Sequence, residues 1–292
     1  MGFEDWYSLA QKQALHADVT LFELDWLILG FLNENKLNLR LRKIQPEPQQ
    51  LQQLQALWQT RLSDRVPVQY LLGKTSWRDL ELIVSPAVLI PRPETELIIE
   101  IVLKARQDLK LREPEIWLDL GTGSGAIALG LAQSLAKYFH QIEIHAVDLS
   151  IEALEIAQKN AKNLNLDQYI HWHQGSWFEQ LADLEAKISG IISNPPYIPT
   201  AQVLELQPEI TLHEPHLALD GGKDGLQSIA HLVEQAPKYL INGGFWLVEI
   251  MAGQEEQVRT LLQHQGKYQQ IQFHSDHSGW IRFVSAVMVE SN

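Results

Sequence analysis

The residues best suited to chemistry in this chain form a short turn that follows an apolar run. Asn194-Pro195-Pro196-Tyr197 comes directly after residues 188–193. The two prolines fix the backbone and remove two N–H donors, so the turn presents acceptors, the Asn194 side-chain oxygen and the Pro195 carbonyl. Two acceptors suit a planar –NH2 group, which has two hydrogens to donate. Tyr197 adds a ring face on which a planar group can stack.

Such a turn can promote methylation of an amide or aniline-like nitrogen. That nitrogen is a poor nucleophile because its lone pair is delocalised. Fixed acceptors aim the lone pair at the methyl carbon and stabilise the positive charge that develops on nitrogen. Since the proton can leave afterwards, no strong base is needed, and positioning supplies much of the rate. We therefore predict that Asn194, Pro195 and Tyr197 are catalytic.

A glycine-rich loop, residues 119–126 with the sequence DLGTGSGA, is the second chemical feature. Its three alternating glycines allow a tight turn and the close approach of a ligand. The same pattern satisfies G-x-G-x-x-G/A, so a dinucleotide site is an alternative. Asp119 can orient the loop or meet an ammonium group, and Asp148, at the end of the next predicted strand, can accept hydrogen bonds from both ribose hydroxyls.

The charge of the ligand separates these two readings. S-adenosylmethionine is net positive and is favoured by acidic residues, whereas a pyrophosphate prefers bare backbone N–H groups. We therefore favour S-adenosylmethionine as the cofactor and S-adenosylhomocysteine as the product. The predicted contacts combine loop residues with the two acids and the amide of the turn: Asp119, Gly121, Thr122, Gly123, Ser124, Gly125, Asp148 and Asn194.

The elements that must position these residues fall into two classes. Residues 1–75 show apolar spacings of three and four, which predict helices, including one through the glutamine-rich segment after Pro48. Residues 80–84 alternate and read as one strand of a hairpin. From about residue 115 strands alternate with helices, which predicts a doubly wound α/β sheet. Ligands bind such sheets at the carboxyl ends of the strands, where the loop, Asp148 and Asn194 all fall.

Composition narrows the function further. The 292 residues include 23 Lys+Arg and 36 Asp+Glu, a net charge of −13, so a broad nucleic-acid-binding surface is not expected. The chain has no cysteine, which excludes disulfides, thiolate nucleophiles and Cys-ligated zinc. The first residues lack the pattern of a signal peptide, and no apolar run reaches the ~20 residues of a membrane span. We expect a cytoplasmic protein, and since nothing demands a dimer, a monomer.

Several segments together resemble the release-factor glutamine methyltransferases, the HemK family. The similarity runs from about residue 66 to 289, while the helices before it match only in length and character. The similar segments, beyond residues 119–126 and Asp148, are 67–73 (PVQYLLG), 88–96 (VLIPRPETE), 194–197 (NPPY), 214–219 (EPHLAL) and 221–226 (GGKDGL).

The resemblance implies a reaction, a partner and an architecture. The family transfers a methyl group from S-adenosylmethionine to N5 of the glutamine in the Gly-Gly-Gln motif of class 1 peptide release factors. A five-helix N-terminal bundle and a seven-strand methyltransferase sheet, with its last strand antiparallel, are implied as well. The expected organisation is a release-factor-docking helical domain, a hairpin and linker, and a catalytic domain, which span residues 1–75, 76–96 and 97–292.

The resemblance also assigns residues to ligands. Trp177 matches a family position near the adenine, and Ser176 stands where many members carry Asp. The glutamine would be held by the turn, and the segment around Arg92 and Glu94 would help to close the site over it. The substrate-binding set is therefore Asn194, Pro195, Pro196, Tyr197, Arg92 and Glu94.

Two other substrates remain open at this stage. The same turn serves enzymes that methylate exocyclic amines of nucleic-acid bases, which need a flipped base and a basic strand track. A sister family methylates a glutamine of a ribosomal protein.

Histidines at 213 and 216 and at 274 and 277 lie near acids, but Pro215 breaks the helix that a zinc motif needs, and the second group reads as a solvated turn. We therefore predict no metal ligands.

Overall fold

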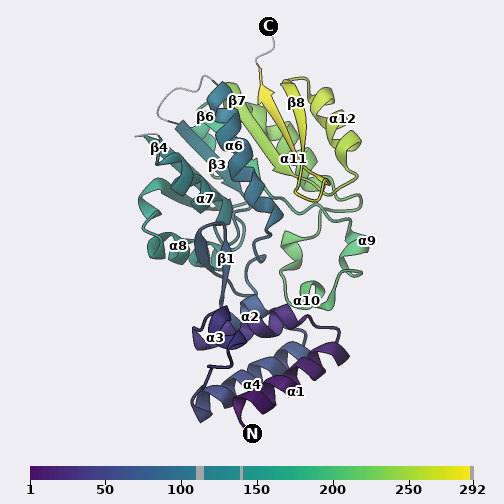
Figure 1. Cartoon of the computed structure of the whole chain (residues 1–292). Coiled ribbons are helices and arrows are strands. Elements are labelled where there is room, and N and C mark those ends of the chain that lie inside the picture. The colour runs from purple at the N-terminus through teal and green to yellow at the C-terminus, as the bar shows by residue number, and fades with distance from the viewer. Residues whose placement is uncertain (110–114, 139–140, 290–292) are drawn as a thin grey trace. The chain divides into compact units, whose positions relative to one another are not determined.

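The protein contains a helical part and a larger part built on a mixed sheet (Figure 1). The computed structural model describes residues 1–109, 115–138 and 141–289. Within these ranges no helix is both long and apolar enough to cross a membrane.

The chain divides into two units, and the first division lies between residues 75 and 76. Unit 1 contains residues 1–75 and also Gln207–His213, whereas the remaining residues form unit 2. The sequence analysis did not separate residues 207–213 from the catalytic domain, and it treated residues 76–96 as a linker. In the structure residues 76–96 belong to unit 2.

Unit 1 consists of helices, as the apolar spacing predicted. Trp6, Leu24, Leu54 and Trp58 are at most 2% exposed and form the centre of its core. The glutamine-rich segment is an ordered helix that begins with a capping box between Glu47 and Gln50. The helices are α1 (Phe3–His16), α2 (Leu21–Leu32), α3 (Lys36–Arg40), α4 (Pro48–Ser63), α5 (Val68–Leu72) and α10 (Pro208–Thr211).

A buried arginine connects the inserted helix α10 to the other helices of unit 1. The Arg61 side chain is 3% exposed, and its guanidinium bonds Glu23 at 2.7 Å and Glu209, of α10, at 2.8 Å. Arg65 contacts the same Glu209 carboxylate at 2.6 Å. Removing either carboxylate would deprive the buried Arg61 charge of one of its two partners, which should cost more than losing a surface ion pair.

Unit 2 contains a seven-stranded sheet with the order β5-β4-β3-β6-β7-β9-β8. Only β9, the last strand in the sequence, runs antiparallel to its neighbours, as the resemblance implied. A separate hairpin, β1 (Lys74–Trp77) and β2 (Leu80–Ile83), precedes the sheet. The sheet strands are β3 (Glu115–Leu120), β4 (Ile142–Asp148), β5 (Ile170–Gln174), β6 (Ile188–Ser193), β7 (Leu240–Glu249), β8 (Tyr268–Ser275) and β9 (Ile281–Met288).

Helices cover the two faces of this sheet. Side chains of α6 and α7 share one apolar core with the sheet, and side chains of α11 and α12 share another. Successive residues of β3 enter the two cores alternately, Trp117 the first and Leu118 the second, which explains why residues 116–118 are apolar without alternation. The α-helices are α6 (Leu97–Asp108), α7 (Ala126–Leu135), α8 (Ile151–Asn163), α9 (Thr200–Val203), α11 (Gln227–Tyr239) and α12 (Glu255–Gln265).

Short 3₁₀ turns complete unit 2, and one of them replaces a longer helix. The connection from β5 to β6 contains η3 (Ala182–Leu184) and no α-helix. The alternation of strands with helices that the sequence predicts from about residue 115 is confirmed. The other 3₁₀ turns are η1 (Glu94–Glu96), η2 (Asp167–Tyr169) and η4 (His216–Ala218).

Candidate active site

The glycine loop leaves the carboxyl end of β3 and leads into α7. Gly121, Gly123 and Gly125 all have positive φ values, +76°, +54° and +85°, which residues with a Cβ rarely adopt. The Gly121 and Thr122 N–H groups both donate to the Val147 carbonyl at 2.9 Å, which holds the loop against β4. A Cβ on Gly123 would meet nothing within 4 Å, so the backbone there faces open space.

Asp119 supports the loop from behind. Its carboxylate is fully buried, and Oδ2 accepts hydrogen bonds from the Thr122 hydroxyl at 2.6 Å and the Ala128 N–H at 3.0 Å. The second oxygen, Oδ1, is buried without a protein partner. Burial raises the pKa of Asp119 to about 7, and the nearby Asp148 charge contributes to this rise.

Asp148 ends β4 beside the loop. Its Oδ2 accepts from the Gly123 N–H at 2.8 Å, and its Oδ1 accepts from the Ser150 N–H at 2.9 Å. Burial raises the pKa of Asp148 even though these hydrogen bonds lower it. Each oxygen keeps a lone pair for a ligand hydroxyl, because a carboxylate oxygen can accept twice.

The Asn-Pro-Pro-Tyr turn is held by a buried network that sequence reasoning missed. The Asn194 Nδ2 donates to the Thr95 hydroxyl at 3.4 Å, and that hydroxyl donates to Glu249 Oε2 at 2.7 Å. The Tyr197 hydroxyl donates to the other oxygen of the same carboxylate, Glu249 Oε1, at 2.9 Å. Thr95 holds one hydrogen of Nδ2 and so orients the amide, which leaves Oδ1 as its acceptor for a ligand.

Glu249 organises this network from the end of β7. It is fully buried, and burial raises its pKa to about 7, against the lowering effect of the Thr95 and Tyr197 hydrogen bonds. Burial and the nearby Glu249 charge in turn hold the Tyr197 pKa well above its usual value. The sequence does contain a signal that could have identified Glu249, because it is an acid at the end of a parallel strand. Asp148 was predicted as a site residue on that same ground.

Close backbone packing supports the turn from its other side. A Cβ on Gly225 would lie 2.2 Å from the Tyr197 carbonyl oxygen, so no larger residue fits there without a shift. The Gln254 side chain donates to that same Tyr197 carbonyl at 3.0 Å. Gly225 lies in the GGKDGL segment, and its close approach explains why that segment contains a glycine at this position.

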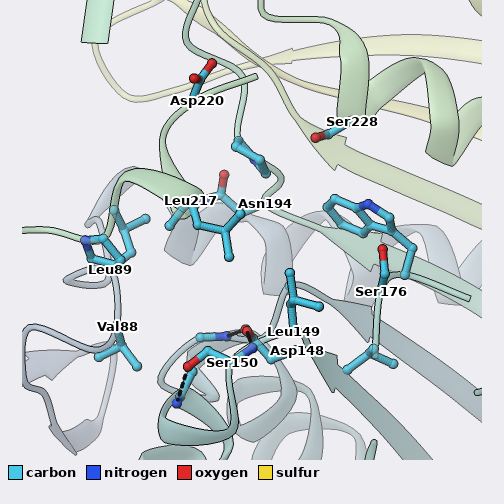
Figure 2. A pocket seen from close by; sticks show the side chains of 18 of the residues that line it. Val88, Leu89, Asp148, Leu149, Ser150, Ser176, Asn194, Leu217, Asp220 and Ser228 are labelled. Carbon is cyan, nitrogen blue, oxygen red and sulfur yellow. Dashed lines mark hydrogen bonds between the residues drawn. The ribbon is translucent and has the colours of Figure 1, made fainter. Parts of the chain in front are cut away.

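A cavity of about 580 Å³ lies at the carboxyl ends of the strands, within the range of ligand pockets (Figure 2). Side chains from β4, from the turn and from the segment after α10 line this cavity. Figure 2 shows Asp148, Asn194 and Leu217 around it. Six of the predicted site residues line it: Gly121, Gly123, Asp148, Trp177, Asn194 and Pro196.

The other predicted site residues do not line this cavity. Those that belong to the loop or the turn support these two segments from the side away from the cavity, as Asp119 and Tyr197 do. Their predicted ligand contacts stay predictions. The set comprises Asp119, Thr122, Ser124, Gly125, Pro195, Tyr197, Arg92 and Glu94.

Arg92 is occupied by an ion pair inside unit 2. Its Nη2 donates to both oxygens of Glu214, at 2.8 and 2.9 Å. The Glu214 side chain is only 2% exposed, and burial raises its pKa while the Arg92 charge lowers it. Glu214 is followed by Pro215 and Leu217, which line the cavity. Arg92 therefore anchors one wall, whereas Glu94 lies close enough to raise the Glu249 pKa.

Trp177 lies opposite the glycine loop in a strained conformation. Its φ of +53° is unusual for a bulky residue, and such strain is common where a side chain must be aimed at a ligand. The ring lines the cavity, and its Cζ3 lies 3.8 Å from the position that a Cβ on Gly121 would take. The Trp177 ring therefore lies in contact distance of the Gly121 backbone and offers the rest of its face to a flat apolar group in the cavity.

The residues present fit S-adenosylmethionine. The described residues that line the cavity include the carboxylates Asp148 and Asp220 but no lysine or arginine, which suits a cationic ligand. The unpaired Asp119 Oδ1 adds a buried acceptor behind the loop. A pyrophosphate would meet this acidic lining unfavourably, so the geometry favours the cationic cofactor over a dinucleotide.

Comparisons with known proteins agree with this chemistry. The family model described as "Methyltransferase small domain" matches residues 95–211. The "Release factor glutamine methyltransferase" of Synechocystis sp. is 47% identical, with 97% of this chain and 95% of that protein covered. The protein of the same name from Thermosynechococcus vestitus is 44% identical, with 98% of each chain covered.

Solved structures support the fold at lower identity. A methyltransferase from Pyrococcus furiosus is 20% identical with a TM-score of 0.50, and 73% of this chain and 91% of that chain are covered. The hMettl16 catalytic domain, crystallised in complex with MAT2A 3'UTR hairpin 6, is 14% identical with a TM-score of 0.55. That second comparison covers 84% of this chain and 85% of the other. These similarities show the methyltransferase fold.

Proposed function

The chain belongs to the release factor glutamine methyltransferase family, and from that premise we propose that it methylates a class 1 peptide release factor. The methyl group goes from S-adenosylmethionine to N5 of the glutamine in the Gly-Gly-Gln motif. One observation carries the proposal at the site. The Asn194 amide is oriented through Thr95 and Glu249, so that its oxygen is available to accept from a substrate –NH2 group.

The cofactor residues follow from the geometry of the loop. We assign the ribose hydroxyls to Asp148, whose two oxygens are spaced for a diol and oriented by the Gly123 and Ser150 N–H groups. Trp177 would pack on the adenine. The positive charges of the cofactor would lie near Asp148, which lines the cavity, and would be favoured also by Asp119, which is buried behind the loop.

S-adenosylmethionine, when bound, supplies an electrophilic methyl group on a sulfonium. The Asn194 oxygen and the Pro195 carbonyl would hold the two N–H groups of the glutamine amide, which turns its lone pair toward that methyl. As the N–C bond forms, the nitrogen becomes positive, and both acceptors stabilise it. The sulfur keeps the electron pair of the broken bond, and the nitrogen then releases one proton to water.

Tyr197 has a positioning role in this scheme. Its ring lies next to Pro196 in the chain, and its hydroxyl is fixed on Glu249. A fixed ring can pack against the planar amide without loss of side-chain entropy on binding. Tyr197 does not line the cavity, so stacking of the glutamine on its ring stays a prediction.

Unit 1 is proposed to dock the release factor. It exposes several large apolar side chains, among them Leu15 at 72%, Phe22 at 62% and Leu37 at 62%. Exposed apolar groups are characteristic of surfaces that bind a protein partner. We propose that the protein acts as a monomer in the cytoplasm, without stable nucleic-acid binding, since one chain supplies the whole cavity.

A methyl-transfer assay with labelled S-adenosylmethionine tests the proposal. The acceptors would be a release factor, its Gln→Ala variant in the Gly-Gly-Gln motif, the glutamine-bearing ribosomal protein, and duplex DNA. We expect label on the intact release factor alone. Label on the ribosomal protein or on DNA, with none on the release factor, would reject the proposed substrate while leaving the N-methyltransferase chemistry standing.

A further inference from the structure

A second group of side chains with ligand chemistry lies on β4 and β5, away from the cavity. Glu143 and His145 are two residues apart on β4, so they project from the same face. His171 on β5 pairs directly with His145, and His173 follows two residues later on that face. Across the parts of the chain that the structure describes, only Glu143, His145 and His171 form a cluster of potential metal ligands.

The ligand atoms of the three side chains lie close together, and the exposed His171 ring, which is stacked on His145 with centroids 4.8 Å apart and an interplanar angle of 25°, would turn to aim its nitrogen at a shared ion. The Glu143 Oε2 lies 3.9 Å from the His145 Nε2 and 4.0 Å from the His171 Nε2. One ligand atom from each residue falls within 4.8 Å of the other two. Zinc ligands at ~2.1 Å from the ion are ~3.4 Å apart in a tetrahedron, so each atom needs to move by about 1 Å or less. Glu143 and His171 are exposed and free to make that movement.

His145 has the nitrogen that a metal ion would take. Its Nδ1 is hydrogen-bonded to the His173 Nε2 at 2.8 Å, so the ring orientation is fixed. Its Nε2 is buried and has no hydrogen-bond partner, although the residue is only 8% exposed. A metal-bound histidine commonly makes such a hydrogen bond through its other nitrogen, which sets the tautomer and the ring plane.

The sheet leaves this region accessible. On the same face, Val147 is buried in the core formed with α11 and α12, but Glu143, four residues earlier, is exposed. The connection after β5 has only the short turn η3 where a helix would otherwise cover the face. An ion could therefore enter from solvent and keep one coordination position for water.

We propose that Glu143, His145 and His171 bind a divalent transition-metal ion, with Zn²⁺ as the ion that suits a His₂Glu ligand set. Two imidazoles and one carboxylate with an open fourth position are a common zinc arrangement. His173 is a positioning residue, because it orients His145 and does not reach the ion. This proposal departs from the expectation of no metal ligands, which considered only groups close together in the sequence.

The site would fasten two strands that also carry the cofactor cavity. After His145, β4 continues to Val147 and Asp148, and β5 leads to Gly175. Val147, Asp148 and Gly175 line that cavity. A shared ion would resist separation of the edge strand β5 from β4. The consequence is a stability effect on unit 2, since no ligand of the ion lines the cavity.

Zinc titration by calorimetry tests the site directly. The protein would be the full chain without a histidine tag, stripped with a chelator, and the probe would be Zn²⁺ alone. The absence of cysteine removes competing thiolates. We expect one ion per chain. Glu143→Gln and His171→Gln, at exposed positions, should each weaken binding at least tenfold, while His264→Gln, an exposed histidine elsewhere, should not.

Two further measurements separate the proposed roles. Co²⁺ should give the visible absorption of a four-coordinate ion in the wild type and lose it in His145→Gln. His173→Gln should weaken binding by about 10- to 100-fold, as expected for a residue that orients a ligand. The proposal would be overturned if the wild type failed to bind Zn²⁺. It would also be overturned if the Glu143→Gln and His171→Gln variants bound Zn²⁺ as tightly as the wild type.

Discussion

The glycine loop and the Asn-Pro-Pro-Tyr turn lie at neighbouring strand ends but present opposite chemistry. In the loop, three glycines with positive φ expose backbone to a ligand, and the acid beside it is oriented by N–H groups from Gly123 and Ser150. In the turn, two prolines remove the donors, and the side chains are fixed by a buried carboxylate, Glu249.

This difference separates binding from catalysis. In the proposed mechanism the loop would match charges that are already present on the cofactor, so it would contribute to ground-state affinity. The turn would meet charge that develops only as the amide nitrogen is methylated, so it would contribute to the rate. Loss of a loop contact should therefore appear in Kd, and loss of a turn contact in kcat.

Asn194→Ala should give the largest effect. Removal of the oriented acceptor should lower kcat by about 100-fold or more, as for other transition-state hydrogen-bond partners. The affinity for S-adenosylmethionine should change little. Rapid-quench methyl transfer and calorimetry would measure the two quantities. Ser228→Ala, which alters another cavity residue, is the control, and a fully active Asn194→Ala enzyme would disprove the acceptor role.

Asp148→Ala should have the reverse signature. Loss of charged hydrogen bonds worth ~1.5–3 kcal/mol should weaken cofactor binding by about 10- to 100-fold. The kcat at saturating cofactor should stay within a few-fold of the wild type. Calorimetry against S-adenosylmethionine provides the measurement, with Asp148→Asn as the milder comparison. A kcat defect without a Kd defect would contradict the division of roles.

Thr95→Val tests whether the turn depends on its buried network. The variant keeps the shape of the side chain but removes the hydroxyl that bridges Asn194 and Glu249. The Asn194 amide could then rotate, and kcat should fall by about tenfold with KM for the protein substrate less affected. Thr95→Ser should restore the rate, which a general loss of packing would not predict.

The pH dependence of cofactor binding should give the smallest effect. Burial raises the pKa of Asp119 to about 7, so this acid gains negative charge as the pH rises from 6 to 8. S-adenosylmethionine should bind about three- to tenfold more tightly across that window. S-adenosylhomocysteine, which lacks the sulfonium charge, should respond less. Asp119→Asn should flatten the curve if this residue is responsible.

Raised carboxyl pKa values also make the stability of unit 2 depend on pH. A carboxyl whose pKa is raised on folding adds stability below its unfolded pKa and loses it as the pH rises through the folded pKa. For Asp119 and Glu249 that loss falls between about pH 4 and pH 7. The affinity and the stability therefore change in opposite directions over part of this range.

Local sequence determined most of the framework. Predominantly apolar runs without alternation predicted β3 and β6, because strands covered on both faces need no polar side. The alternating glycines predicted the loop, since only glycine adopts its backbone freely. The two prolines predicted a rigid acceptor turn. None of these inferences needs long-range contacts, because each depends on the conformational limits of neighbouring residues.

The tertiary structure alone decided which distant residues serve these motifs. Thr95, Asn194 and Glu249 are separated by about 55 to 154 positions, yet they share one hydrogen-bond network. The cluster of Glu143, His145 and His171 depends on the pairing of β4 with β5, and residues 207–213 join unit 1 through Glu209. Strand order and register place these groups together, and no local pattern encodes them.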